Sequence, residues 1–167
     1  MRKTDVFLLS PGNARAIYQD LADDFSALEP PVWAGLLARF LLTNGYAAEI
    51  LDQGGHGLSS SAIADTIALE KPRLAVVVVY GQQPSASTQN MTASYELAER
   101  IKERSPETKI LMLGGHPSAL PKQTLLEGKA DFVCQGEGPF TLLSLLQATD
   151  LEDAQQLKKV PGLWFRS

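Results

Sequence analysis

The chain contains one cysteine and two histidines among its 167 residues, and this scarcity excludes several kinds of site. Cys134 has no partner for an internal disulfide, and there is no second thiol for a cysteine-based metal site. An iron–sulfur cluster held by three or four cysteines of this chain is excluded as well. Clustered positive charge is also missing, because 15 Lys and Arg residues are scattered among 19 Asp and Glu residues. We therefore predict no nucleic-acid partner.

Long hydrophobic runs are absent too. The amino terminus leads into a short apolar run, Val6–Leu9, which cannot span a bilayer and has no small-residue cleavage site after it. Together with the single cysteine, this predicts a cytoplasmic protein without a membrane span. Hydrophobic residues make up 44% of the chain, a globular balance, and the length suffices for one domain with a real core.

Short apolar runs alternate with longer amphipathic segments, which is the pattern of β-α units around a parallel sheet. The strands are predicted at Asp5–Ser10, Ala47–Asp52, Leu74–Tyr80, Lys109–Leu113 and Asp131–Gln135. The helices are predicted at Val32–Thr43, from Ser59 or Ser60 to Leu69, at Gln89–Arg104, and near Pro121–Leu126 and Pro139–Ala148. The third strand is an uninterrupted β-branched run and should be central. We predict an α/β fold, a flavodoxin-like doubly wound sheet of five parallel strands in the order 2-1-3-4-5.

The segment after Ala148 differs in composition from the rest. It is polar over Thr149–Lys159 and then ends on bulky apolar residues, including Trp164 and Phe165. One alternative is a last strand that packs onto the domain, and the other is a linker into a further domain. We assign residues 1–148 to the domain, and residues 149–167 to a linker or the start of a missing C-terminal domain.

Glycine, amide and hydroxyl groups follow every predicted strand, at the edge where open parallel sheets bind their ligands. Glycine at a strand end lets a large ligand approach the backbone, although short loops also need such residues as turns and helix caps. The candidates are Pro11, Gly12 and Asn13 after the first strand, Gln53, Gly54 and His56 after the second, Gly81, Gln82, Ser85, Ser87 and Thr88 after the third, Gly114, Gly115 and His116 after the fourth, and Gly136 and Glu137 after the fifth.

Several functions are excluded by the residues at the strand ends. Pro11 and a long insertion stand where a flavin or phosphate site needs a glycine-rich turn into a helix. Gly136–Gly138 lacks the third glycine of a dinucleotide fingerprint, and the acidic residues of a phosphoacceptor receiver domain are missing. The two histidines and the carboxylates form no nucleophile–base arrangement, so we do not expect the chain to be an enzyme on its own.

Several segments match a known family in combination. They are Pro30–Leu37, Asn44–Tyr46 with Asp52, Gly81–Thr88, Leu113–Pro117, Asp131–Gly138 and Val160–Leu163. Through them, nearly the whole chain resembles the amino-terminal cobalamin-binding domain of cobalamin-dependent radical SAM enzymes, a Rossmann-like B12-binding domain. The resemblance implies a corrinoid across the carboxyl edge of the sheet, with its nucleotide tail beside the third and fourth strands.

The resemblance also implies individual roles. Hydroxyl groups would bond the tail or the corrin amides, and glycines would let the benzimidazole approach, which suits the amide-rich corrin. The implied roles are tail or amide bonding for Ser85, Ser87 and Thr88, close approach at Gly114 and Gly115, closure of the tail pocket by Gly136 and Glu137, and a border of the ring at Pro11–Asn13 and Gly54–His56.

Neither histidine is predicted to ligate cobalt. The cobalamin modules of mutases and methionine synthase carry Asp-x-His-x-x-Gly after the first strand, and the corresponding loop here has no histidine. His56 follows the wrong strand at the wrong spacing from Asp52, and His116 lies by the expected tail slot. We expect base-off, His-off binding, with Trp33 or the segment before it facing the lower side of the cobalt.

Radical SAM chemistry needs a Cys-x3-Cys-x2-Cys motif for a [4Fe–4S] cluster, which this chain lacks. S-adenosylmethionine and the cluster would therefore belong to the missing C-terminal radical SAM domain. The resemblance implies a part in methyl transfer, or in a rearrangement or cyclisation. Two other functions stay open: a flavodoxin-like small-molecule or protein-interaction domain without a metal cofactor, and a stand-alone corrinoid carrier.

Overall fold

The computed structural model describes residues 3–12, 30–81 and 84–166, and the structural statements below refer to these residues. The strands are β1 (Val6–Ser10), β2 (Ala48–Asp52), β3 (Leu74–Val79), β4 (Lys109–Gly114), β5 (Phe132–Cys134) and β6 (Leu163–Phe165). They form one sheet in the order β2-β1-β3-β4-β5-β6. The five predicted strands and their parallel order are confirmed, and β6 adds a sixth strand antiparallel to β5.

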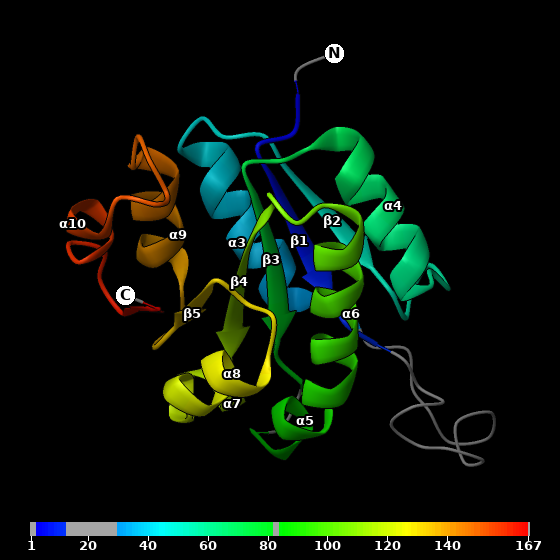
Figure 1. Ribbon diagram of the computed structural model, residues 1–167. Helices are drawn as coiled ribbons and strands as arrows, with labels where there is room; N and C mark the ends of the chain where they lie inside the picture. The colour runs from blue at the N-terminus through cyan, green and yellow to red at the C-terminus, as the bar shows by residue number, and fades with distance from the viewer. Residues whose placement is uncertain (1–2, 13–29, 82–83, 167) are drawn as a thin grey trace.

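Helices cover both faces of the sheet (Figure 1). One face carries α3 (Val32–Thr43), α9 (Pro139–Gln147) and the short α10 (Ala154–Leu157), and the other carries α4 (Ser60–Glu70), α6 (Met91–Arg104) and α8 (Pro121–Glu127). Two short helices, α5 (Pro84–Gln89) and α7 (Gly115–Ala119), lie near the arrowheads of β3 and β4. The doubly wound α/β architecture is therefore confirmed.

Strand β3 shows why the sheet is buried on both faces. All of its side chains are buried, and β1 and β4 pair with its two edges. Val76 and Val78 pack in the cluster under α3 and α9, whereas Val77 and Val79 pack in the cluster under α4 and α6. This alternation follows from the two-residue period of a strand. Each buried valine contributes about 1.5–3 kcal/mol relative to exposure, so the predicted central strand is also the centre of the core.

The helix ends mostly follow the sequence signals. Helix α4 begins after Ser59, whose Oγ accepts a hydrogen bond from the Ala62 amide at 3.1 Å. Helix α3 ends before Gly45, which has a positive φ of 88°. The prediction over Gln89–Arg104 was wrong at its start, because α6 begins only at Met91 and a separate helix, α5, precedes it. Helix α5 has six residues and weak helix formers, so its contacts with α7 and α6, and the bond from Ser87 to the Val79 carbonyl of β3, decide its structure.

The tail packs onto the sheet, which is the first of the two alternatives stated above. Phe165 of β6 pairs with Phe132, and Leu163 pairs with Cys134. The Arg166 guanidinium donates to the carbonyl oxygens of Leu125 and Gly128 at the end of α8. The sheet thus extends beyond residue 148, and the expected domain boundary at that residue stays a prediction. None of the helices that the structure describes is long and apolar enough to cross a membrane.

Candidate functional site

The loops after β1 and β2 meet at the carboxyl edge of the sheet. A Cβ on Gly12 would lie 3.3 Å from the Gly54 nitrogen, so the two backbones are in close contact. Gln53, only 5% exposed, joins the loops, because its Oε1 accepts from the Gly12 amide at 3.3 Å and its Nε2 donates to Ser60 Oγ at 3.0 Å. The structure brings these predicted residues together. The Gln53 amide links the loops here, and its contact with a cofactor stays a prediction.

The β2 loop turns tightly over its own aspartate. The Asp52 carboxylate lies over Gly55, where an added Cβ would come within 2.4 Å of Oδ2. The backbone amide of His56 donates to the Asp52 carbonyl at 3.1 Å, and the residue is exposed. Pro11 of the neighbouring loop is buried. His56 therefore lies on the surface at the β2 side of this edge.

The ends of β3 and β4 approach each other more closely than any side chain would allow. Gly114 has a φ of 150°, and a Cβ there would lie 2.0 Å from the carbonyl oxygen of Val79. Ser87, 1% exposed, donates its hydroxyl to the same Val79 oxygen and accepts from the His116 amide at 2.9 Å. We call the group Val79, Ser87 and His116 the Ser87 clasp. Its hydroxyl is engaged within the protein, so the expected bond from Ser87 to a cofactor stays a prediction.

An exposed polar pair lies beside the Ser87 clasp. Thr88 Oγ1 is 3.1 Å from His116 Nδ1, and this pair links α5 to α7. Gly115 is exposed next to it. Gly81 lets α5 pack on the end of β3, since a Cβ there would meet the Ala86 methyl at 2.4 Å. Thr88 and His116 therefore present hydroxyl and imidazole groups at the surface of the edge.

The opposite side of this edge carries stacked aromatic rings. Trp33, in the first turn of α3, stacks on Tyr80 with ring centroids 4.5 Å apart and an interplanar angle of 20°. Burial is the main cause that raises the pKa of Tyr80, and nearby Cys134 and Glu137 raise it further. Sequence reasoning selected Trp33 but missed Tyr80, which directly follows the central strand. That position was the available signal.

Apolar side chains continue from the aromatic pair onto α3 and α9. Trp33 is 36% exposed, and Val32 and Leu36 beside it in α3 are exposed as well. Phe140, in the first turn of α9, is exposed and meets Phe40 edge to face at 5.7 Å. The glycine-rich edge is thus bordered by a polar pair on α5 and α7 and by apolar groups on α3 and α9.

The loop after β5 closes the far end of the edge. The Gly136 amide donates to Ser118 Oγ at 2.9 Å, which links the loop to α7. Gly136 and Gly138 have positive φ values of 115° and 97°, and a Cβ on Gly138 would lie 3.0 Å from the side chain of Leu113. Glu137 between them is exposed. These contacts hold the loop as a tight turn around an accessible carboxylate.

Cys134 is a core residue. Its thiol lies 3.3 Å from Thr141 Oγ1, and burial raises its pKa. A buried thiol with a raised pKa is a weak nucleophile and a poor metal ligand. Within the described parts of the chain, no three His, Cys, Asp or Glu side chains are grouped to hold a metal ion.

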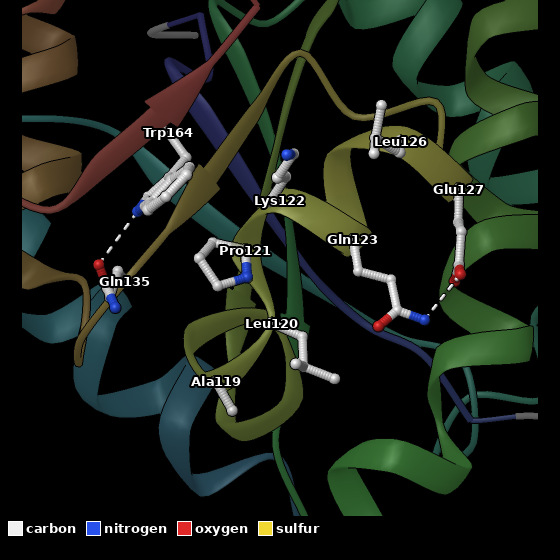
Figure 2. Close-up of a pocket in the computed structure, with 9 residues that line it drawn as sticks. All are labelled: Ala119, Leu120, Pro121, Lys122, Gln123, Leu126, Glu127, Gln135 and Trp164. Carbon is white, nitrogen blue, oxygen red and sulfur yellow. Dashed lines mark hydrogen bonds between the residues drawn. The ribbon is translucent and has the colours of Figure 1, made fainter.

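An open apolar pocket of about 520 Å³ lies next to the β5 loop (Figure 2). Its lining includes Leu120, between α7 and α8, and Pro121 and Leu126 of α8. The indole of Trp164 closes one side and donates to Gln135 Oε1 at 3.0 Å. None of the predicted site residues lines this pocket. It is separate from the glycine-rich edge, which is the better candidate for a large polar ligand.

Three predicted residues receive only a partial or no structural account. Asn13 and Gln82 lie outside the described residues. Ser85 lies in α5, and its side chain is likewise outside the description. Their predicted contacts stay predictions.

Comparison with known proteins adds a family. A family model for the B12 binding domain matches residues 18–146. Among solved structures, the radical S-adenosylmethionine methyltransferase TsrM from Kitasatospora setae, with a tryptophan substrate and a SAM analogue bound, has a TM-score of 0.72 and 17% identity over 97% of this chain. The cobalamin-dependent S-adenosylmethionine radical enzyme OxsB, with aqua-cobalamin and S-adenosylmethionine bound, has a TM-score of 0.74 and 18% identity over 99% of this chain.

These solved proteins are much longer. The present chain spans 28% of the TsrM chain and 21% of the OxsB chain. A second structure of TsrM, with cobalamin and a [4Fe-4S] cluster bound, has a TM-score of 0.70 and 16% identity. At such identities the similarity establishes the fold. No curated protein sequence matches the chain.

Proposed function

The chain belongs to the B12-binding domain family, and from this premise we propose that it binds cobalamin across the carboxyl edge of its sheet. The observation that carries the proposal is the accessible backbone at that edge. Gly54 and Gly136 lie in the loops after β2 and β5, and Gly115 begins α7 after β4. A Cβ on Gly54 or Gly115 would make only ordinary contacts, and a Cβ on Gly136 would have no atom within 4 Å. A corrin ring is broad and rimmed with amides, so backbone donors and acceptors without side chains in front of them suit it.

In this proposal, different side chains around the edge contact different parts of the cobalamin. Thr88 and His116 offer hydrogen bonds to the nucleotide tail or the corrin amides. Trp33, stacked on Tyr80, faces the lower side of the ring with an apolar surface. Glu137 closes the far side of the tail, where its carboxylate accepts from amide groups. Such a mixture of apolar surface and few polar groups is typical of cofactor sites.

We further propose base-off, His-off binding. The His116 Nδ1 is already paired with Thr88, and His56 follows β2. Neither stands after β1, where the imidazole of the cobalamin modules with the Asp-x-His-x-x-Gly motif stands. An apolar indole below the cobalt would exclude water from that side without supplying a ligand.

The wider role follows from the resemblance of the chain to longer enzymes. We propose that this chain is the cofactor-carrying domain of a radical SAM enzyme that transfers methyl groups, in a reducing cytoplasm that suits its lone buried thiol. When bound, cobalamin supplies a cobalt-centred methyl carrier. The residues described here orient that cofactor and shield it, whereas S-adenosylmethionine and the cluster bind to a separate domain, because this chain has a single cysteine.

The direct test is retention of the cofactor. The purified chain is incubated with hydroxocobalamin, desalted, and its visible spectrum recorded; we expect retention of about one corrin per chain. Gly54→Ala should bind nearly as well, while Gly54→Leu should bind at least tenfold more weakly with an unchanged melting temperature, because the larger side chain covers the edge. A wild-type chain that elutes without corrin would favour a flavodoxin-like domain that has no metal cofactor.

The axial state is tested on the reduced cofactor. The electron paramagnetic resonance spectrum of bound cob(II)alamin reports a nitrogen ligand through its hyperfine splitting. We expect no nitrogen splitting in the wild type, in His56→Ala or in His116→Ala. A nitrogen-ligated cobalt in all three proteins would refute base-off, His-off binding, and splitting lost in one variant would identify that histidine as a ligand.

A further inference from the structure

Gln135, the residue before the Gly136–Gly138 loop, is held by the tail of the chain through both its backbone and its side chain. Its amide donates to the Gly162 carbonyl at 2.7 Å, and its side-chain Oε1 accepts from Trp164 Nε1 at 3.0 Å. Figure 2 shows the indole N–H of Trp164 directed at the side-chain amide of Gln135. Gly162 has a φ of 68°, and a Cβ there would lie 2.4 Å from the Gln135 carbonyl oxygen. Only glycine permits this approach.

The tail that grips Gln135 is itself anchored on both sides of Trp164. Before it, Thr141 Oγ1 donates to the Pro161 carbonyl at 2.7 Å. After it, the Arg166 guanidinium donates to the Gly128 carbonyl at 3.1 Å. Trp164 is paired in register with Val133 of β5. Strand β6 therefore keeps its place on the sheet, and its contacts restrain Gln135.

The same loop is anchored at its other end by α7 and β4. The Gly136 amide donates to Ser118 Oγ, and Gly138 packs against Leu113. Between Gly136 and Gly138, Glu137 is exposed at the edge. The position of Glu137 thus depends on both ends of the loop. The tail holds one of these ends through its contacts with Gln135.

We propose that Gly162 and Trp164 are positioning residues of the cofactor site, which act through Gln135 on the loop that carries Gly136 and Glu137. This inference rests on the proposed cobalamin binding. It assigns the tail a role in the site, although it lies outside the loops that follow the parallel strands. Trp164 touches no cofactor in this arrangement; its indole N–H holds the residue that leads into the loop.

The main test compares two glycines that both have a positive φ. Gly162→Ala places a methyl against the Gln135 carbonyl, while Gly45→Ala introduces similar left-handed strain, with no neighbour within 4 Å of the new Cβ, at the end of α3. We expect the Kd for hydroxocobalamin to rise at least tenfold in Gly162→Ala and less than twofold in Gly45→Ala. Equal Kd values for the two variants would overturn the proposal.

A second pair of variants guards against misfolding of Gly162→Ala. Trp164→Phe and Gln135→Leu each remove one partner of the same hydrogen bond and keep the bulk of the side chain. Each should raise the Kd about threefold, and the double variant should show no further increase, because both changes break one contact. A ninefold increase in the double variant, or no increase in the single variants, would overturn the proposal.

Amide hydrogen exchange separates this inference from the proposed function. Without any cofactor, Gly162→Ala and Trp164→Phe should speed exchange in the peptide that contains residues 135–138 and leave exchange in the β3–α5 region unchanged. If the wild type retains no hydroxocobalamin, the proposed function fails while faster exchange still supports the control of the loop by the tail. Unchanged exchange at residues 135–138 would overturn that control by itself.

Discussion

The two halves of the carboxyl edge are held together in different ways. In the β3–β4 half, Gly114 and the Ser87 clasp join the strand ends through a backbone contact and a hydroxyl that is 1% exposed. In the β5–β6 half, Gln135 is joined to Gly162 and Trp164 of the tail by contacts at the surface. One half is closed by buried groups and the other by a partly exposed strand.

The difference distinguishes contacts that stabilise the whole fold from contacts that hold the site locally. Breaking a buried hydrogen bond leaves a desolvated group without a partner, which costs about 1–3 kcal/mol. At the surface water replaces a lost partner, so the loss is smaller and stays local. We therefore expect changes at Gly114 and Ser87 to lower global stability, and changes at Gln135 and Trp164 to affect mainly the local order of the β5 loop.

The largest effect on the free energy of unfolding is expected from a methyl group at Gly114. Gly114→Ala would place a Cβ 2.0 Å from the Val79 carbonyl oxygen at a φ of 150°, so the strands must separate. We expect a loss of about 3 kcal/mol or more in the free energy of unfolding, measured with urea. The control, Gly35→Ala in α3, meets nothing within 4 Å and should gain up to about 1 kcal/mol. A Gly114→Ala protein as stable as the wild type would contradict the tight closure.

The next test compares two buried serines. Ser87→Ala leaves both the Val79 carbonyl and the His116 amide without the hydroxyl, and should cost about 1–3 kcal/mol. Ser94→Ala removes an equally buried hydroxyl that donates to the Asn90 carbonyl, which keeps its helical bond from the Ser94 amide. That change should cost less than about 0.5 kcal/mol, since alanine favours the helix. Similar losses from urea titrations of the two variants would show that the Ser87 clasp is not special.

A smaller effect is expected from the tail. Arg166→Ala removes the guanidinium that donates to the carbonyls of Leu125 and Gly128 at the end of α8. Exposed charge-assisted contacts at a helix end contribute about 0.3–1 kcal/mol, so thermal unfolding should shift only slightly. Amide exchange should increase in β6, while Lys122→Ala, which removes an exposed cation in the first turn of α8, should leave β6 unchanged. A large loss of global stability in Arg166→Ala would remove the contrast between the halves.

The buried half was also the easier half to predict from the sequence. The five parallel strands were predicted from apolar runs, and every residue of one of them, Leu74–Val79 in β3, is buried. Gly114 and Gly115 were selected because two glycines follow a strand. The sequence does not show that the Ser87 hydroxyl bonds the Val79 carbonyl oxygen. Every residue carries a backbone carbonyl, so the residue type of the partner gives no signal.

The exposed half was harder for a physical reason. Strand β6 has three residues, and α10 has four, too few for a period to be recognised. Trp164 was noted as a bulky apolar residue, but its bond to Gln135 joins residues 29 apart and depends on the antiparallel register of β6. Tyr80 was missed because it ends an apolar run and is included in the predicted strand Leu74–Tyr80, whereas β3 ends at Val79. Such residues are found only when tertiary contacts are known.

The smallest expected effect is a change in the pKa of Tyr80, which follows β3 and is influenced by groups of the β5–β6 half. Burial raises the pKa of this phenol above its usual 10.0, and Cys134 and Glu137 of the β5 half add to the rise. A raised pKa in the folded state favours the neutral phenol, so its contribution to stability is complete below pH 10 and is lost as the pH rises through the folded-state pKa.

Two variants should change the pKa of Tyr80 unequally. Trp33→Ala uncovers the ring and should lower the pKa more than Glu137→Gln, because burial is the larger cause. Alkaline titration of tyrosinate absorbance measures both shifts, with Tyr80→Phe as the background to subtract. If Trp164→Phe lowers this pKa as Glu137→Gln does, the tail sets the distance between Glu137 and the phenol. A shift in Glu137→Gln alone would mean that the loop keeps its place without the indole, and that the exposed half is held by its backbone contacts.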